Sequence, residues 1–423
     1  MILSKIQELD LDLIGFPRLV RLNPQVPWKT RGNGAVSFQL GKGVGNPTRV
    51  GHVNTVDILS FPSSDDAEIE KECIGRVKDL LVHDIEFFAR LPESNTNPGV
   101  VIVSHQFEEA VYWDAVRKIV EKDEMITLIE KEHGWFKEFK NGRGIIGATA
   151  GIGWRGFHDK TFELIAYRIE SRWGSRRTVD DASVRYFDKK CVSAFDNYDY
   201  DNNHINIMPN SPCPVLFGIR GDSYQDLIEY MPILKTEWFG DWLIFESNQG
   251  TDDHIIDSSL GEIQEFESVN VKGVVSKEPV TISGGHVIFS INDGKYSIEC
   301  AAYEPTKQFR DVIRQLEIGD EVRVYGGVRK KPFTINLEKI GVLHCVDVFE
   351  KVENPVCPVC KKHMKSKGKG QGFYCKKCRT RADEGVMKKK NRSLKEGLYE
   401  VPVCARRHLS RPLKRTGKVS NEN

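Results

Sequence analysis

Near its C-terminal end the chain reads Cys357-Pro-Val-Cys360-Lys-Lys-His-Met-Lys-Ser-Lys-Gly-Lys-Gly-Gln-Gly-Phe-Tyr-Cys375-Lys-Lys-Cys378, two CxxC pairs separated by fourteen residues. Each pair is typical of a tight knuckle that presents two thiolates to one metal ion. Four thiolates complete a closed tetrahedral site, which leaves no open position for catalysis. The spacing therefore predicts a zinc ribbon with these four cysteines as ligands. His363 or His408 as a substitute ligand, and four unrelated buried cysteines, are the alternatives.

The charge is divided unevenly around this motif. The 423 residues hold 61 Lys and Arg against 60 Asp and Glu, a formal net charge of +1. From Cys357 to Lys418, however, 20 basic residues stand against 4 acidic ones, so this part carries +16 and the remainder −15. Such asymmetry predicts a polyanionic partner for the C-terminal part, with solubility alone as the alternative. The cations expected to contact it are Lys376, Lys377 and Arg379 in the ribbon and Arg406, Arg407 and His408 beyond it.

Upstream of the ribbon, residues 268–347 show the pattern of an OB-fold β-barrel. The turn Asn292-Asp-Gly294 joins two alternating segments into a hairpin. Three strands, a helix and two strands is the OB order, and its second and third strands commonly bind single-stranded nucleic acid. Phe289, Tyr296 and Tyr303 are the candidate stacking residues. The expected strands are 268–275, 286–291, 295–302, 321–328 and 334–340, and the expected helix is 308–316.

The first 260 residues alternate helical and extended segments, with helices expected at 67–81 and 108–122 and strands at 35–38 and 100–103. Two glycine-rich basic stretches, 27–34 and 141–147, lie among them. Glycines let backbone amides approach an anion, and the nearby cations neutralise phosphate charge. The Walker A spacing is absent, so ordinary turns are the alternative. The residues expected at a phosphate are Lys29, Arg31, Gly32, Asn33, Gly34 and Arg143.

A cluster of acidic and aromatic residues follows in Phe195-Asp196-Asn197-Tyr198-Asp199-Tyr200-Asp201. Carboxylates pair with ammonium or guanidinium groups and aromatic faces add cation–π attraction, so the cluster suits a cationic ligand. A divalent metal site and a plain polar loop are the alternatives. Cys213 lies nearby in a proline-rich segment, where a buried structural thiol is favoured over a catalytic one.

Several uncommon motifs occur in one collinear order. They include Ile-Gly-Phe-Pro-Arg-Leu-Val-Arg-Leu-Asn-Pro at 14–24 and Pro-Cys-Pro-Val-Leu-Phe-Gly-Ile-Arg-Gly at 212–221, with further motifs at 27–34, 96–99, 195–197, 304–310, 370–379 and 401–410. In these motifs the chain resembles the archaeal tRNA(Ile2) 2-agmatinylcytidine synthetase family. The resemblance implies an α+β multidomain protein with a kinase-like α/β domain, a ferredoxin-like domain, an OB-fold and a zinc ribbon. The expected bounds are 1–133, 134–260, 261–348 and 349–423 with the basic C-terminal region.

The resemblance also implies an activity. Members of the family use ATP to activate the C2 carbonyl of the wobble cytidine in the CAU anticodon, and agmatine then displaces the activated oxygen. The implied cofactors are ATP, Mg²⁺ and Zn²⁺, the partners are isoleucine tRNA and agmatine, and the location is the cytoplasm. Asp196, Asn197, Pro212 and Cys213 match the motifs that imply agmatine binding, and Lys29 and its neighbours match those that imply ATP binding.

The chain departs from the family at its N-terminus. The family's Gly-Ile-Asp-Asp-Thr-Asp segment and nearby threonine, which supply the metal-binding carboxylates and the phosphorylated residue, have no counterpart here, so the catalytic residues stay unknown. We expect that roughly 35 residues, including a first core strand, precede Met1 in the complete protein, because without them the sheet would be unpaired and the phosphoryl transfer unassisted. The alternative functions are a non-catalytic OB-fold and zinc-ribbon RNA-binding protein, and a single-stranded DNA-binding factor. A membrane span is not expected, because no run of about 20 apolar residues occurs.

Overall fold

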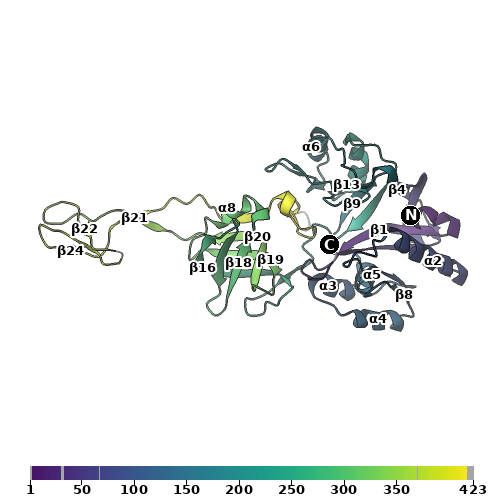
Figure 1. Ribbon diagram of the computed structural model, residues 1–423, viewed down its shortest axis with the longest axis horizontal. Helices are drawn as coiled ribbons and strands as arrows, with labels where there is room; N and C mark the ends of the chain where they lie inside the picture. The colour runs from purple at the N-terminus through teal and green to yellow at the C-terminus, as the bar shows by residue number, and fades with distance from the viewer. Residues whose placement is uncertain (1, 30–32, 66, 369, 417–423) are drawn as a thin grey trace.

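A computed structural model describes residues 2–29, 33–65, 67–368 and 370–416. The molecule is elongated (Figure 1): the N-terminal half forms a broad body on the right of the view, a β-barrel lies in the middle, and a small β-unit stands at the far left on a thin arm. No helix in the described ranges combines the length and the apolar character needed to cross a bilayer.

One mixed sheet runs through the whole N-terminal body. In the described residues it has eight strands in the order β10-β13-β9-β14-β4-β5-β1-β2. β14 is the junction, because it pairs antiparallel with β9 on one side and, on the other, antiparallel with β4 and parallel with β1. Residues on both sides of the expected 133/134 boundary therefore share one sheet. The strands are β1 (Asp12–Arg21), β2 (Gly34–Gly41), β4 (Thr48–Val53), β5 (Val56–Phe61), β9 (Thr161–Tyr167), β10 (Ala194–Phe195), β13 (Val215–Gly221) and β14 (Trp242–Ser247).

Helices and a small second sheet surround the part of this sheet near β2. The expected helix 67–81 starts and ends later than predicted, as α2 (Lys71–Phe88). The expected helix 108–122 is wrong in its second half: α3 (Ala110–Arg117) ends because Lys118 adopts an extended backbone, and α4 (Lys122–Lys131) begins separately. The strand at 100–103 is confirmed as β7 (Gly99–Ile102), which pairs with β8 (Trp135–Glu138). The remaining short elements here are α1 (Ile2–Lys5), β3 (Gly43–Val44) and β6 (Ser63–Ser64).

The second glycine-rich stretch begins a helix, α5 (Gly144–Gly153). A methyl group on Gly144 would lie 2.2 Å from the backbone nitrogen of Gly99, so only glycine allows this helix to approach the loop before β7. Gly151 faces the side chains of Ala35 and Ser37 on β2. The glycines therefore bring α5 close to two strands at once, and the residues of 141–147 are brought next to those of 27–34.

The other end of the sheet is covered by α6 (Asp181–Lys190) and α7 (Tyr224–Tyr230). Phe187 and Leu227 from these helices pack with Leu164 of β9 and Phe217 of β13 in a buried core. Asp180 and Ser223 cap the two helices with side-chain hydrogen bonds to the backbone N–H groups of Ser183 and Asp226. A short hairpin of β11 (Tyr198–Asp199) and β12 (His204–Ile205) follows β10.

The OB-fold is confirmed in its order of elements. β16 (Ser268–Thr281) pairs with both β17 (Val287–Asn292) and β19 (Glu321–Val328), and β20 (Thr334–His344) pairs with β19 and β18 (Ser297–Ala302), which closes the barrel. Phe289 is 1% exposed, so the expectation that it stacks on a base is wrong; alternation placed it on the inner face of its strand. Tyr296 is 44% exposed. The barrel also contains α8 (Phe309–Ile313), β15 (Ile255–Asp257) and β26 (Gly397–Glu400).

Beyond the barrel the chain leaves and returns through a two-stranded arm of β21 (Phe349–Glu353) and β25 (Val386–Lys389), all of whose residues are exposed. At its tip lies the three-stranded sheet of β22 (Lys365–Ser366), β23 (Phe373–Tyr374) and β24 (Arg381–Ala382). The chain then forms β26 on β20 and continues back to the N-terminal body, where Gly250 and Asp252 donate backbone hydrogen bonds to His408 and Leu409. We call residues 397–416 the C-terminal strap.

Candidate functional site

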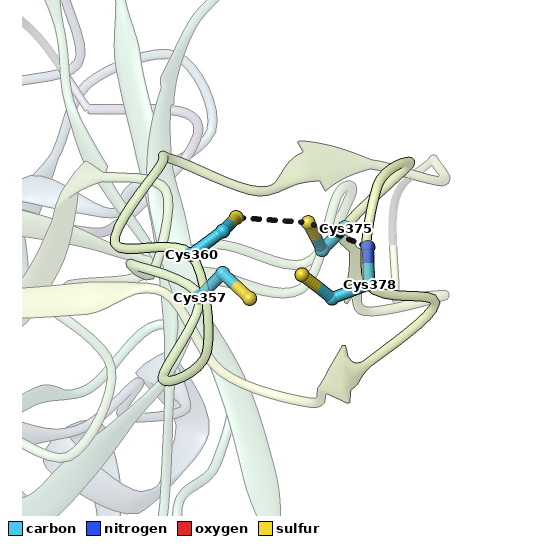
Figure 2. Close-up of side chains that lie close together, drawn as sticks. All are labelled: Cys357, Cys360, Cys375 and Cys378. Atoms are coloured by element: carbon cyan, nitrogen blue, oxygen red, sulfur yellow. Dashed lines mark hydrogen bonds between the residues drawn. The ribbon is translucent and has the colours of Figure 1, made fainter.

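The four predicted zinc ligands come together at the tip of the arm (Figure 2). The sulfurs of Cys357, Cys360, Cys375 and Cys378 all lie within 4.8 Å of one another. Two matching turns place them: the N–H of Lys361 donates to the carbonyl of Cys357, and the N–H of Arg379 donates to that of Cys375, at 2.9 and 2.8 Å. Both of these basic residues have a left-handed backbone, with φ of 57° and 58°. A tetrahedral thiolate site for zinc fits this arrangement.

Two of these thiols have pKa values shifted in opposite directions, and that of Cys378 is raised to about 12 by burial and by the neighbouring cysteines. The backbone N–H of Cys360 and the hydroxyl of Thr380 lower the pKa of the Cys357 thiol to about 6. Thiolate is the form that binds zinc. His363 lies outside the cluster, with its Nδ1 atom 3.1 Å from the carbonyl oxygen of Asn354. His408 belongs to the strap, and neither histidine joins the sulfurs.

The expected RNA contacts divide into two groups. Lys376, Lys377 and Arg379 are exposed on the ribbon, and in the described ranges none of them has a carboxylate within 4.0 Å. Their cations are therefore available to a polyanion. The RNA-binding role itself stays a prediction.

The other group, in the strap, corrects the expectation for Arg406, whose side chain is buried, whereas Arg407 is partly exposed and His408 is exposed. Arg406 is buried and forms ion pairs with Asp196 and, at 2.5 Å, with Glu400. Arg407 lies 3.1 Å from Glu338 on β20, and His408 lies 2.9 Å from the guanidinium of Arg220. These side chains fasten the strap to the body.

The acidic–aromatic cluster is dispersed by the fold. Asp196 faces Arg406, whereas Asp199 accepts hydrogen bonds from Asn202 and from the backbone N–H of Cys404. Asp201 contacts Gln308 on the barrel, at 3.1 Å. The three carboxylates thus have three separate partners and form no metal-binding group in the described chain. Burial raises the pKa of Asp196 despite its pairing with Arg406.

The remaining residues predicted to bind agmatine lie around β13. Asn197 exchanges hydrogen bonds with the backbone of Arg220, which joins the end of β10 to β13. Pro212 and Cys213 lie in the loop before β13, and the guanidinium of Arg177 donates to the carbonyl oxygens of Pro209, Ser211 and Cys213 at 2.9–3.0 Å. Sequence reasoning missed Arg177, because nothing in the spacing signals a contact across more than thirty residues.

The two glycine-rich basic stretches line one cavity of about 1430 Å³ in the N-terminal body. Its wall contains Lys29, Asn33, Gly34 and Arg143, while Arg31 and Gly32 fall outside the described residues. The guanidinium of Arg143 lies 4.7 Å from the ring centre of Trp28, a pairing that sequence reasoning also missed. Asn97, Pro98 and Gly99 line the same cavity.

The cations of this cavity suit an anionic ligand. Burial, with the nearby Arg407, lowers the pKa of Lys29 to about 8, and its amino group donates to the carbonyl of Pro24. Arg143 has no carboxylate within 4.0 Å among the described residues, and burial lowers its pKa. An adenine nucleotide fits such a wall, since phosphates attract both cations and the Trp28 ring offers a stacking face. Apart from the four cysteines, no group of three or more His, Cys, Asp or Glu side chains among the described residues could hold one metal ion, so we assign no Mg²⁺ ligands.

Comparison with known proteins covers nearly the whole chain. Four domain families match: the TiaS TCKD domain at 1–141, the TiaS FLD domain at 142–254, an OB-fold nucleic acid binding domain at 269–343 and the TiaS C-terminal zinc ribbon domain at 354–394. The tRNA(Ile2) 2-agmatinylcytidine synthetase TiaS of Archaeoglobus fulgidus is 42% identical over 95% of this chain and 89% of its own length.

Solved structures agree with these matches. The TiaS–tRNA(Ile2)–ATP complex is 40% identical, with a TM-score of 0.83 over 98% of this chain and 92% of that chain. The TiaS–tRNA(Ile2)–AMPCPP–agmatine complex is 38% identical, with a TM-score of 0.80 over the same shares. The ferredoxin-like, OB-fold and zinc-ribbon expectations are confirmed by the domain matches. Identity at this level over nearly the full length shows that the chain belongs to the TiaS family of tRNA(Ile2) 2-agmatinylcytidine synthetases.

Proposed function

We propose that this protein is an ATP-dependent ligase that joins agmatine to C2 of the wobble cytidine in the CAU-anticodon isoleucine tRNA, so that the tRNA reads AUA as isoleucine. The observation that carries the proposal is the full-length similarity to TiaS proteins solved with tRNA(Ile2), ATP and agmatine. Because the proposed substrate is a tRNA, we infer that the protein acts in the cytoplasm. We keep the four domains 1–133, 134–260, 261–348 and 349–423 as the working division, with a kinase-like first domain.

The large cavity is the proposed nucleotide site. Lys29 and Arg143 come from two distant stretches and converge on it, together with Gly34 and the backbone of Gly144. Their positive charge neutralises the phosphates, and neither cation has a carboxylate within 4.0 Å among the described residues, although Asp65 and Glu68 line another part of the cavity. ATP is needed because a carbonyl oxygen is a poor leaving group until it carries a phosphoryl or equivalent group. The residues that transfer this group are not assigned.

The amine is proposed to bind beside the loop before β13. Pro212 and Cys213 lie in this loop, whose backbone is fixed by Arg177, whereas Asn197 lies near the other end of β13, beside Arg220. Asp196 is already paired with Arg406, so we do not propose that it contacts agmatine. Its ion pair holds the C-terminal strap in place and thereby supports the site indirectly. The amine of agmatine must lose its proton to attack C2, and it displaces the activated oxygen as the C–N bond forms.

The ribbon is the proposed grip on the tRNA. A zinc ion held by the four thiolates would fix the knuckles, because a unit of this size buries too little apolar surface to fold without metal. The lysines between the ligands would then contact phosphates. The barrel, with the exposed Tyr296, presents a second surface to the same substrate.

A direct test is the transfer of radiolabelled agmatine to tRNA by the purified full-length protein. We expect label in tRNA(Ile2) in the presence of ATP, no label without ATP, and none in a tRNA(Ile2) variant whose wobble cytidine is replaced by uridine. Equal labelling of both tRNAs would contradict the assigned target base. Tight tRNA binding without any labelling would favour the non-catalytic RNA-binding alternative.

A further inference from the structure

An edge of the ferredoxin-like part combines exposed arginines with exposed tryptophans. The segment 168–178 follows β9, whose position Figure 1 shows in the upper part of the body. Residue 238 lies next to this segment, because Glu237 and Thr178 are joined by two hydrogen bonds of 2.9 and 3.0 Å. Trp173 is 39% exposed and Trp238 is 72% exposed. We call Arg172, Trp173, Arg176 and Trp238 the arginine–tryptophan edge.

Two other arginines of the same segment are used to build it. Arg168 is 4% exposed, and its guanidinium forms an ion pair with Glu237 at 2.7 Å and donates to the carbonyl oxygen of Ser175 at 2.8 Å. Arg177 holds the loop before β13, as described above. Because a buried ion pair adds little net stability, its value here lies in the fixed geometry that it gives the segment.

The two arginines of the edge take no part in the ion pair and hydrogen bonds that build the segment. Arg172 and Arg176 are exposed, and within the described ranges neither has a carboxylate within 4.0 Å. The indole N–H of Trp173 is already satisfied by the carbonyl oxygen of Arg168 at 3.0 Å, so its ring face is what it offers to a partner. Paired cations and flat aromatic faces are the elements with which proteins bind unpaired nucleotides.

We propose that the arginine–tryptophan edge binds unpaired nucleotides of the tRNA substrate, the arginines at phosphates and the tryptophans at bases. The proposal rests on the proposed function, which makes tRNA the substrate. Arg177 links the edge to the loop that carries Pro212 and Cys213, so RNA bound here lies next to the proposed amine site. The edge thus helps to hold the target loop where agmatine is delivered, in addition to the grip of the ribbon.

The test compares variants of the full-length protein for tRNA(Ile2) binding by fluorescence anisotropy. Trp238→Ala should weaken binding about tenfold, the loss expected for one stacked base. Arg172→Ala with Arg176→Ala should lower the slope of log affinity against log salt by about 1.4, which corresponds to two phosphate contacts. The matched controls are Lys189→Ala with Lys190→Ala, an exposed cation pair on α6, and Phe157→Ala, which removes an equally exposed ring. The controls should bind as the unsubstituted protein does.

A benzophenone side chain in place of Trp238 gives an independent readout, because photo-crosslinked nucleotides can be mapped by reverse transcription. Crosslinks to unpaired nucleotides support the proposal, and crosslinks to helical stems alone overturn it. Edge variants that match the controls in affinity and salt slope also overturn it. If the unsubstituted protein does not bind tRNA(Ile2) at all, that result contradicts the proposed function itself, on which this inference rests.

Discussion

The buried arginine of the C-terminal strap provides a sharp test of how the molecule is held together. In Arg406→Ala the guanidinium that faces Asp196 and Glu400 is lost, and both carboxylates stay largely buried. Removal of one partner of a buried ion pair costs about 3–5 kcal/mol, because the remaining charge is uncompensated. We expect a loss of this size in the apparent free energy of unfolding of the body. Lys395→Ala, an exposed cation that precedes the strap, should leave the stability unchanged within about 0.5 kcal/mol.

The pH dependence of the free energy of unfolding tests whether the uncompensated carboxylates cause the loss. Burial already raises the pKa of Asp196 and of Glu400 in the unsubstituted protein, and loss of Arg406 must raise both further. A carboxyl whose pKa is higher in the folded than in the unfolded state destabilises the fold when it is ionised, so the protein gains stability as the pH falls through the folded-state pKa. The deficit of Arg406→Ala should therefore shrink as the pH is lowered from 8 into the acid range.

Urea unfolding followed by tryptophan fluorescence at several pH values measures both effects. Arg406→Ala combined with Asp196→Asn should recover part of the loss at pH 8, because one of the two uncompensated charges is gone. The reasoning is refuted if Arg406→Ala unfolds at the same urea concentration as the unsubstituted protein, or if its deficit grows as the pH falls.

Three further predictions concern the zinc site, the nucleotide cavity and the loop before β13. Cys375→Ser should abolish binding of one zinc per chain, measured by atomic absorption, and weaken tRNA binding, while the urea transition of the body stays unchanged because the ribbon core contacts only its own residues; unchanged tRNA affinity would contradict the role of the ribbon. Binding of a fluorescent ATP analogue should weaken as the pH rises above about 8, where Lys29 loses its charge, and Lys29→Gln should bind more weakly without this dependence; equal pH profiles would exclude Lys29 from the phosphates. Arg177→Ala should weaken agmatine binding in calorimetry about tenfold or more by freeing the loop at Cys213, with tRNA affinity less affected; intact agmatine affinity would place the amine elsewhere.

Local spacing was enough to predict the parts whose structure is determined locally. The CxxC pairs and the Asn-Asp-Gly turn specify their own backbone geometry, and the ribbon knuckles and the order of the barrel strands are as expected. The ends of helices were not predicted correctly from local sequence. The helix expected at 108–122 is divided at Lys118, where no proline or glycine marks the break.

The parts that sequence reasoning missed all depend on contacts between distant residues. Arg406, Arg407 and His408 look like a basic surface when only the neighbouring residues are considered. The partners of these three residues lie up to 383 residues away in sequence, and they can be found only once the strap is known to return to the body. In the same way, each glycine-rich stretch was a weak signal by itself, and the fold supplies the stronger argument by placing Arg143 against Trp28.

Nucleoside analysis of the wobble position tests the central claim most directly. The full-length protein is incubated with tRNA(Ile2), ATP and agmatine, and the tRNA is digested and analysed by mass spectrometry. We predict that the wobble cytidine is replaced by its agmatine conjugate, at that position alone and only when ATP is present. A tRNA that is bound by the protein but still carries unmodified cytidine after saturating ATP and agmatine would contradict the assignment as a ligase.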